Sequence, residues 1–434
     1  MVPNSPNPFT IGKSVQSDRF IGRTAELSSA FDQITGQGNI AIWGSPGIGK
    51  SSFLNVLADP QAWQVRGYDP SDSIIIWMSC LDIVPFSATG FWAEILNQIQ
   101  FNAEDEAIVS EVKAVLAQGN ANRDGLRQVL REIVKLRKSL VLLIDDYDAA
   151  LRVQTGYDDG AIGAFVSDCR NLCSYPPGSQ CLSMVVTSLR RLNELGPKLQ
   201  PGASPWYNHY LFLPLKPFGE NEVAALLGDL NFLLTPVLRD GIREMTNGHP
   251  ALIQNAGHLL HRELRQNLPA GKKPDPHAFA EDFRRSTLHL YEAFWDLSTD
   301  LEQSLMMLVA LTNLKGKLTN KRYDLGDLDV IFSQKERELS NLVEQGLLTT
   351  KSRSGEFKYA FASSMMEWWV VEEMENSSED SLRDRQKVFL NLMNHRQAES
   401  VTNAIRWLWK NKDELPTILE WLTQVVAAFP KGML

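Results

Sequence analysis

The sequence predicts an α/β fold: a doubly wound, parallel β-sheet followed by smaller, mostly helical units. Three observations lead to this expectation. Short apolar runs of strand length alternate with helical patterns through roughly the first half of the chain. One such run, 39–43, leads into a glycine-rich turn and then into a helix pattern. Another run, 140–144, ends in the acidic pair Asp145–Asp146.

Length and composition are those of a multidomain globular protein. The 434 residues predict about two to four domains, and the formal net charge of −9 argues against a generally basic nucleic-acid binder. The four cysteines lack the spacing of a zinc site, so reduced thiols are expected. The first residues lack a signal-peptide pattern, and no run approaches the roughly 20 apolar residues that span a bilayer. We therefore expect a cytoplasmic protein without a membrane partner.

The first two of five expected parts are an extended, proline-rich leader at 1–18 and the α/β core at 19–215. The run 73–79 is apolar almost throughout, as is typical of a strand covered on both faces. The expected strands of the core are 39–43, 73–79, 140–144, 181–187 and 209–213, and its expected helices lie near 26–34, 52–58, 89–101, 104–117, 123–137 and 160–172.

The remaining three parts are a helical lid at 216–296, a winged helix at 297–375 and a helical adaptor or sensor segment at 376–434. In the lid we expect helices at 220–229, 236–246, 250–266 and 276–295, with a loop at 271–276. The winged helix is predicted from capping-box spacings at Thr299–Glu302 and Ser333–Glu336, followed by strand patterns at 347–351 and 357–361 around a Ser354–Gly355 turn.

The glycine-rich turn matches the phosphate-loop pattern G-x-x-x-x-G-K-[ST], with Gly44, Gly49, Lys50 and Ser51 at its fixed positions. Glycines let the backbone wrap a polyphosphate so that successive N–H groups point inward. Lys50 is expected to contact the β- and γ-phosphates, and the Ser51 hydroxyl to ligate Mg²⁺. The residues expected to hold the phosphates are Gly44, Ser45, Pro46, Gly47, Ile48, Gly49, Lys50, Ser51 and Ser52.

The acidic pair after run 140–144 supplies the second half of the expected site. Asp145 is expected to hold Mg²⁺, directly or through water. Asp146 is placed to orient or deprotonate the attacking water. Run 181–187 ends in a polar, basic stretch in which Thr187 or Ser188 could bind the γ-phosphate, and Arg190 could add positive charge in the transition state. The neighbouring Arg191 is the alternative for that last role.

The chain resembles the STAND-type P-loop ATPases, the AAA+-related family of signal-transducing switches, and within it the bacterial novel-STAND and archaeal-type branches. The residues that carry this resemblance are NPF (7–9), FIGRTAEL (20–27), GSPGIGKS (44–51), LLIDDYD (142–148), VVTSLR (185–190) and NGHPALIQ (247–254). The resemblance implies that Phe20 and Ile21 pack on adenine, that Gly22 permits the turn into the next helix, and that Arg23 and Pro250 lie near the base. The preference for ATP or ADP over GTP rests on this resemblance.

These observations predict a slowly hydrolysing, ATP- and Mg²⁺-dependent molecular switch. The resemblance implies bacterial signalling or antiviral defence, with a protein effector or self-association as the output. One alternative is a DNA-associated ATPase of the origin-binding or transposition-helper kind. The segment 297–375 holds nine Lys/Arg against thirteen Asp/Glu, so nucleic acid is a possible but disfavoured partner. The other alternative is a scaffold that binds ATP without hydrolysing it.

Overall fold

The computed structural model describes residues 6–199, 202, 204–230, 234–267, 275–318, 323, 325–353, 356–422, 425 and 427. The chain forms two compact units. One unit comprises 13–45 and 49–215, and we call it the sheet unit. The other comprises 1–12, 46–48 and 216–434, and we call it the helical unit.

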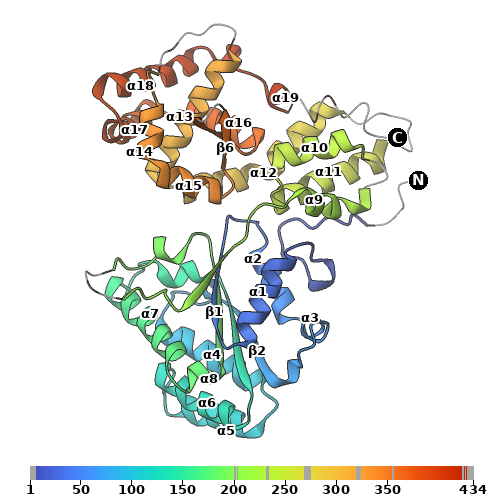
Figure 1. Cartoon of the computed structure of the whole chain (residues 1–434), viewed down its shortest axis with the longest axis vertical. Coiled ribbons are helices and arrows are strands. Elements are labelled where there is room, and N and C mark those ends of the chain that lie inside the picture. The colour runs from blue at the N-terminus through green and yellow to red at the C-terminus, as the bar shows by residue number, and fades with distance from the viewer. Residues whose placement is uncertain are drawn as a thin grey trace. The chain divides into compact units, whose positions relative to one another are not determined.

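The sheet unit is built on a five-stranded, all-parallel sheet with the order β2-β3-β4-β1-β5 (Figure 1). Its strands are β1 (Asn39–Trp43), β2 (Ser73–Ser79), β3 (Ser139–Asp145), β4 (Leu182–Ser188) and β5 (Tyr210–Pro214). The expected strands therefore all form, two of them with the predicted bounds. Every residue of β1 and β4 is buried, which explains why parallel strands covered on both faces appear in the sequence as continuous apolar runs.

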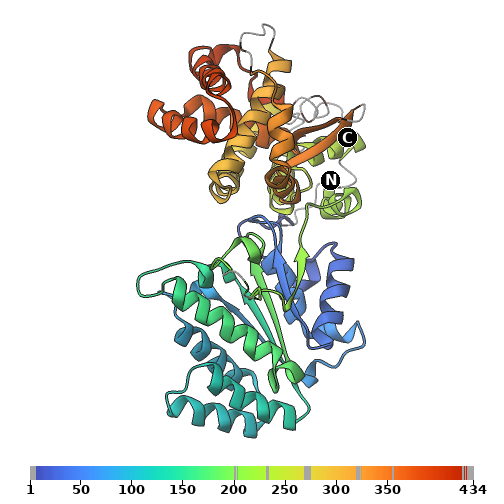
Figure 2. The same ribbon diagram turned by 60° about the vertical axis from the view of Figure 1, so that its left-hand side comes forward.

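Helices cover both faces of this sheet, as the alternating pattern predicts. Figures 1 and 2 show α1, α2 and α3 on one face and α4, α6 and α7 on the other. The helices of the unit are α1 (Thr24–Thr35), α2 (Lys50–Ala58), α3 (Pro60–Gln64), α4 (Ala88–Asn102), α5 (Glu106–Ala117), α6 (Arg123–Lys135), α7 (Asp159–Ser174) and α8 (Gly178–Cys181). All four cysteines are free and buried in this unit.

The register of the sheet gathers the strand ends that matter for the site. Ser79 pairs with Asp145 across β2 and β3, and Trp43 pairs with Ser188 across β1 and β4. The residue after β1, Gly44, donates its N–H to the Ser188 carbonyl at 3.2 Å. Because the strands are parallel, their carboxyl ends share one edge, where ligands of open α/β sheets bind.

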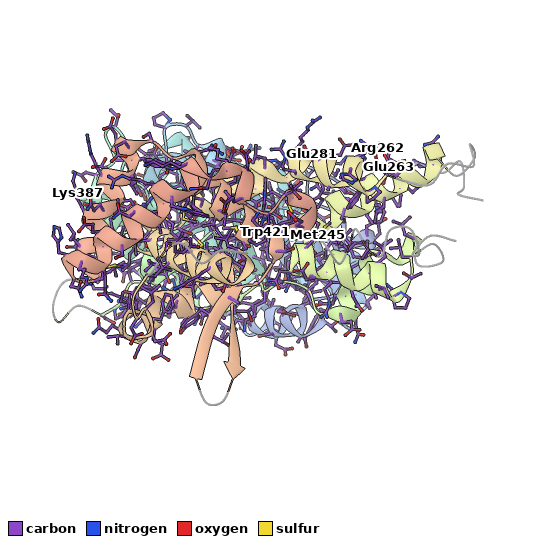
Figure 3. The ribbon with its side chains drawn as sticks, turned by 90° about the horizontal axis from the view of Figure 1, so that it is seen from above. Met245, Arg262, Glu263, Glu281, Lys387 and Trp421 are labelled. Carbon is purple, nitrogen blue, oxygen red and sulfur yellow. The ribbon has the colours of Figure 1, made fainter. Side chains whose placement is uncertain are left out.

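The helical unit contains the remaining helices and one hairpin. Trp421 and Met245 both belong to its core, and Figure 3 labels them. Its helices are α9 (Glu220–Leu226), α10 (Pro236–Thr246), α11 (Pro250–Asn267), α12 (Pro276–Leu297), α13 (Asp300–Lys317), α14 (Asp329–Gln334), α15 (Glu336–Glu344), α16 (Ser364–Asn376), α17 (Glu379–Leu392), α18 (His395–Lys410) and α19 (Ile418–Trp421). The antiparallel hairpin pairs β6 (Leu348–Arg353) with β7 (Glu356–Phe361).

The order α13, α14, α15, β6, β7 is the order expected of a winged helix, whose boundaries stay a prediction. The capping box of Thr299 and Glu302 is confirmed, because each accepts a backbone N–H of the other. The capping box predicted at Ser333–Glu336 is wrong. Ser333 lies inside α14, which ends one residue before Lys335, the N-cap of α15. The helical backbone of Ser333 excludes the extended conformation that an N-cap needs.

Two predicted turns include residues that the structure does not describe. They are the Ser354–Gly355 turn of the hairpin and residues 271–274 of the lid loop. The described end of that loop is Asp275, which caps α12 by accepting the His277 N–H. Within the described part of the chain, no helix has both the length and the apolar character to span a bilayer.

The first described residues of the leader are held by helix α11. Asn7 donates to the His258 carbonyl of α11, and the Thr10 N–H donates to Gln254 of the same helix. Phe9 is 7% exposed and packs over Gly257, where an added Cβ would lie 2.3–2.5 Å from the ring. Gly257 is therefore the position on α11 that admits the phenyl ring of the leader.

This packing predicts that the effect of Gly257→Ala on the free energy of unfolding changes sign when the Phe9 ring is removed. Gly257→Ala should destabilise the wild-type chain by about 1–3 kcal/mol, because the methyl group overlaps the Phe9 ring. In a Phe9→Ala background the same substitution should stabilise by about 0.5–1 kcal/mol, because alanine is the better helix former. Denaturant midpoints of the four chains measure this cycle. Equal destabilisation in both backgrounds would show that Phe9 does not pack on α11.

Candidate nucleotide-binding site

The phosphate loop has the backbone that its glycines predict. Gly44, Gly47 and Gly49 have φ values of 157°, 74° and 106°, and Gly49 is the N-cap of α2. The last two lie where side chains with a Cβ are strained. The first N–H groups of a helix have no partner within the helix, so Lys50, Ser51 and Ser52 offer backbone donors beside the loop.

Lys50 is buried, with 9% of its surface exposed. Its ammonium donates to the Gly44 carbonyl at 2.8 Å and to the Ser45 carbonyl at 3.2 Å. Burial lowers the pKa of Lys50, and the nearby charges of Asp148, Asp145 and Asp146 act in the opposite direction. Lys50 is therefore within electrostatic range of Asp145, the last residue of β3, and of Asp146 and Asp148, which follow it.

Asp145, the last residue of β3, is 3% exposed. Its Oδ1 accepts the Thr187 hydroxyl and the Asp146 N–H, the latter at 3.1 Å. Thr187 therefore fixes the orientation of Asp145, whereas its predicted contact with the γ-phosphate stays a prediction. Carboxylate and hydroxyl oxygens suit Mg²⁺, which keeps several waters and takes the rest of its ligands from one or two carboxylates and the phosphates. Asp145 and Ser51 fit that donor set.

Asp146 has a left-handed backbone, with φ 52° and ψ 41°. Such a conformation costs a residue with a side chain on the order of 1 kcal/mol. Its N–H donates to Asp145 and, at 3.2 Å, to Thr187, while its Oδ2 accepts the Ser79 hydroxyl at 2.8 Å. Burial raises the pKa of Asp146, and the charge of Asp145 raises it further. A carboxylate with a raised pKa and a fixed direction is suited to accept a proton from water.

Two residues of the site did not emerge from the sequence. Ser79 ends β2, and its pairing with Asp146 depends on β2 lying beside β3. Asp148 is 5% exposed, and its Oδ1 accepts the Leu189 N–H at 2.9 Å. Burial raises the pKa of Asp148, while the Leu189 N–H and Lys50 oppose this shift. A third acid in the run LIDDYD was the available signal for Asp148.

The two arginines after β4 have different surroundings. Arg190 Nε lies 2.8 Å from Glu194 Oε2, and the Arg190 side chain is 12% exposed. Arg191 lies over the Trp43 ring, with its guanidinium carbon 5.0 Å from the ring centroid. Arg190 thus holds an anionic oxygen, the type of partner that a phosphate offers.

The residues expected on the adenine side are placed as follows. Phe20 packs edge-on against Phe53 of α2, with ring centroids 6.2 Å apart. Gly22 has φ 72°, which confirms the expected turn into α1, and Ile21 precedes it. Arg23 is 4% exposed and forms an ion pair with Glu26 at 3.6 Å. Pro250 begins α11 in the helical unit, so its contact with adenine stays a prediction, as do those of Phe20, Ile21 and Arg23.

The side chain of Ser52 binds the leader. Its hydroxyl accepts the Val15 N–H at 3.0 Å, and Asn55 of the same helix donates to the Val15 carbonyl. The contact of Ser52 with phosphate stays a prediction, and its backbone N–H is the group suited to make it. Pro46, Gly47 and Ile48, the middle of the loop, are grouped with the helical unit.

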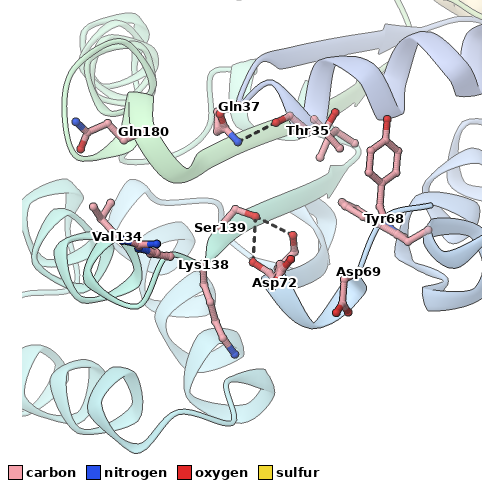
Figure 4. A pocket seen from close by; sticks show the side chains of 13 residues that line it. Thr35, Gln37, Tyr68, Asp69, Asp72, Val134, Lys138, Ser139 and Gln180 are labelled. Carbon is pink, nitrogen blue, oxygen red and sulfur yellow. Dashed lines mark hydrogen bonds between the residues drawn. The ribbon is translucent and has the colours of Figure 1, made fainter. Parts of the chain in front are cut away.

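A cavity of about 380 Å³ lies elsewhere in the sheet unit (Figure 4). It is lined by Ser73 and Ser139, which begin β2 and β3 and share a hydrogen bond of 2.7 Å. Gln37, whose amide donates to the Thr35 carbonyl, also lines it. Because the strands are parallel, their amino ends lie at the edge opposite the phosphate loop. This cavity is therefore separate from the candidate nucleotide site.

Comparison with known proteins gives a family match for one segment. Residues 19–155 match the family model described as an AAA ATPase domain. No curated protein matches the chain. The ORC2 protein of Aeropyrum pernix, solved in ADPNP–ADP complexes, is 14% identical with a TM-score of 0.49, and the alignment covers 93% of this chain and 100% of that one.

Two further solved structures are similar to the chain. A Walker-type ATPase of Pyrococcus abyssi is 13% identical with a TM-score of 0.48, covering 83% of this chain and 99% of that one. A STAND protein of Pyrococcus horikoshii with a tetratricopeptide-repeat sensor is 15% identical with a TM-score of 0.36. That alignment covers 98% of this chain and 56% of the other.

The matched segment contains the residues of the candidate site. The phosphate loop, Lys50 and the carboxylates of 145–148 all lie inside residues 19–155. Residues 19–155, about a third of the chain, are thus similar to an AAA ATPase domain.

Proposed function

We propose that the protein is an ATP-dependent molecular switch of the STAND type that hydrolyses its nucleotide slowly. The observation that carries the nucleotide part is the placement of Lys50 among Asp145, Asp146 and Asp148 at the carboxyl edge of the sheet. A buried ammonium close to a loop with inward N–H groups suits a triphosphate.

Each residue has a role in this proposal. Lys50 exchanges its bonds to the Gly44 and Ser45 carbonyls for phosphate oxygens. Asp145 and Ser51 would hold Mg²⁺, which would neutralise charge on the phosphates. Asp146, directed by Ser79, accepts a proton from the attacking water or orients it. Arg190 leaves Glu194 for the γ-phosphate as negative charge develops there.

The switch part is supported by where the two units divide. Residues 44–45 and 49–51 of the loop belong to the sheet unit, and 46–48 belong to the helical unit. The division of the chain into units therefore passes through the phosphate loop. A nucleotide with different affinity for two arrangements shifts their populations by that difference. The proposed output is partner binding or self-association, which the STAND resemblance links to signalling or defence.

Loading with different nucleotides should change the size or assembly of the chain. We expect ATP or ADP to copurify with the protein, and the Mg²⁺–ATP-analogue and ADP states to differ in mass or in radius of gyration. Light scattering and small-angle scattering measure both quantities. The same samples with duplex DNA added test the DNA-associated alternative, which predicts salt-sensitive binding. Identical mass and radius in both states would argue against a switch.

Asp146→Asn should lower kcat for ATP hydrolysis by about 10²–10⁴-fold, the usual worth of a general base, while ATP binding is retained. The asparagine keeps an oxygen for the Ser79 hydroxyl but accepts no proton. Asp159→Asn, at an exposed aspartate of α7, is the matched control and should hydrolyse ATP at the wild-type rate. Steady-state phosphate release and calorimetry separate the two effects. Unchanged turnover in Asp146→Asn would remove the catalytic role of this residue.

Substitution of Arg190 should mainly affect kcat, whereas substitution of Arg191 should mainly affect stability. Arg190→Ala should lower kcat about 10²-fold, because one cationic donor to the transition state is lost. Arg191→Ala should leave kcat within about threefold of wild type and lower stability by about 0.5–2 kcal/mol, through the lost contact with Trp43. Phosphate release and thermal unfolding of both variants provide the comparison. The reverse pattern would assign the phosphate-sensing role to Arg191.

A further inference from the structure

Asp148 accepts a hydrogen bond that plays no part in the roles proposed for Lys50, Asp145 and Asp146. It lies in the 3-10 helix Tyr147–Leu151 that follows the acidic pair, and it is almost fully buried. Its Oδ1 accepts the N–H of Leu189 at 2.9 Å. A side chain that follows β3 thereby fixes the backbone that follows β4.

The segment held in this way, 188–190, carries groups of the proposed site. The Ser188 carbonyl accepts the N–H of Gly44, the first residue of the phosphate loop. The Ser188 hydroxyl donates to the Arg190 carbonyl at 2.7 Å. Leu189 lies between Ser188 and Arg190. The hydrogen bond from its N–H to Asp148 therefore fixes the backbone that leads to Arg190.

Asp148 makes this backbone bond with a buried carboxylate. A neutral oxygen can accept the Leu189 N–H as well, and burying a carboxylate costs free energy unless charge compensates it. The charges of Lys50 and Arg152 both oppose the rise that burial causes in the pKa of Asp148. They offset part of the cost of burying the carboxylate that holds the segment carrying Arg190.

We propose that Asp148 is a positioning residue for ATP hydrolysis, which acts by holding the Leu189 N–H and so placing the 188–190 segment against the γ-phosphate. This inference rests on the proposed function. In this proposal the carboxylate acts through the Leu189 N–H and not by contact with the nucleotide. Its effect should therefore appear in kcat and depend on the accepting oxygen rather than on the negative charge.

Substitutions of Asp148 can distinguish the role of its accepting oxygen from the role of its negative charge. Asp148→Ala removes both and should lower kcat about tenfold, the worth of one net hydrogen bond. Asp148→Asn keeps an oxygen for Leu189 and should hold kcat within about threefold of wild type, with KM for ATP equal or lower because a buried negative charge is gone. Asp159→Ala, at an exposed aspartate, is the control and should match wild type. Asp148→Leu, similar in size and lacking an acceptor, takes the place of Asp148→Ala if the latter does not fold.

The result expected is a kcat defect in Asp148→Ala or Asp148→Leu that Asp148→Asn rescues. Equal kcat defects in the Ala and Asn variants would overturn the inference, because the charge itself would then take part. Wild-type kcat in the acceptor-less variant would overturn it as well, as would a defect confined to KM. A wild-type chain that binds ATP without turnover would refute the proposed hydrolysis and this inference together, whereas an active wild type with an unimpaired acceptor-less variant refutes the inference alone.

Discussion

The compensation of buried charge at one edge of a parallel sheet is the constraint on which the rest of this structure depends. The order β2-β3-β4-β1 brings the loop after β1 and the acids after β3 to the same edge. Lys50, Asp145 and Asp148 are each at most 9% exposed, so each would be costly if unpaired. Lys50 meets carbonyls of its own loop, and each of the two acids accepts a hydrogen bond from the strand β4 or the residue after it. In the proposed function the bonds of Asp145 and Asp148 to this strand end are kept, whereas Lys50 and Arg190 exchange partners.

The same bonds also maintain local strain. Asp146 keeps its left-handed backbone because its N–H and its side chain are both held, the first by Asp145 and Thr187 and the second by Ser79. Released from these partners, the residue would relax to a common conformation and its carboxylate would lose direction. The pKa of Asp146 is raised by burial and by the charge of Asp145, whereas the hydrogen bond from Ser79 and the charge of Lys50 oppose this rise. The strained backbone of Asp146 lowers the stability of the sheet unit, and the burial of strands β1 and β4 offsets this cost.

The sequence predicted the parts of this site whose signals are local. A fixed spacing identified Lys50, and an apolar run closed by acids identified Asp145 and Asp146, because each signal lies within about ten residues. The partners of these residues depend on strand order instead. Nothing local connects Ser79 with Asp146, or Asp148 with Leu189, since both pairs form only when β2, β3 and β4 are neighbours. The failure at Ser333 has a different cause: the capping spacing is present, but the preceding helix α14 extends through it. Packing of Phe9 on Gly257, some 250 residues away, was likewise beyond any local pattern.

The leader is bound to one helix in each unit. Its residues 7–10 are bound to α11 in the helical unit, and Val15 is bound to Ser52 and Asn55 of α2 in the sheet unit. Between these anchors lies Gly12, with φ 74° and open space around its Cα, at the division between the units. Helix α2 begins with Lys50, so the helix proposed to bind phosphate also holds one end of the leader. The short tether limits how far its two anchors can separate, because extended chain spans at most about 3.6 Å per residue. In the proposed switch, a conformational change must therefore keep both anchors within the reach of this tether or release one of them.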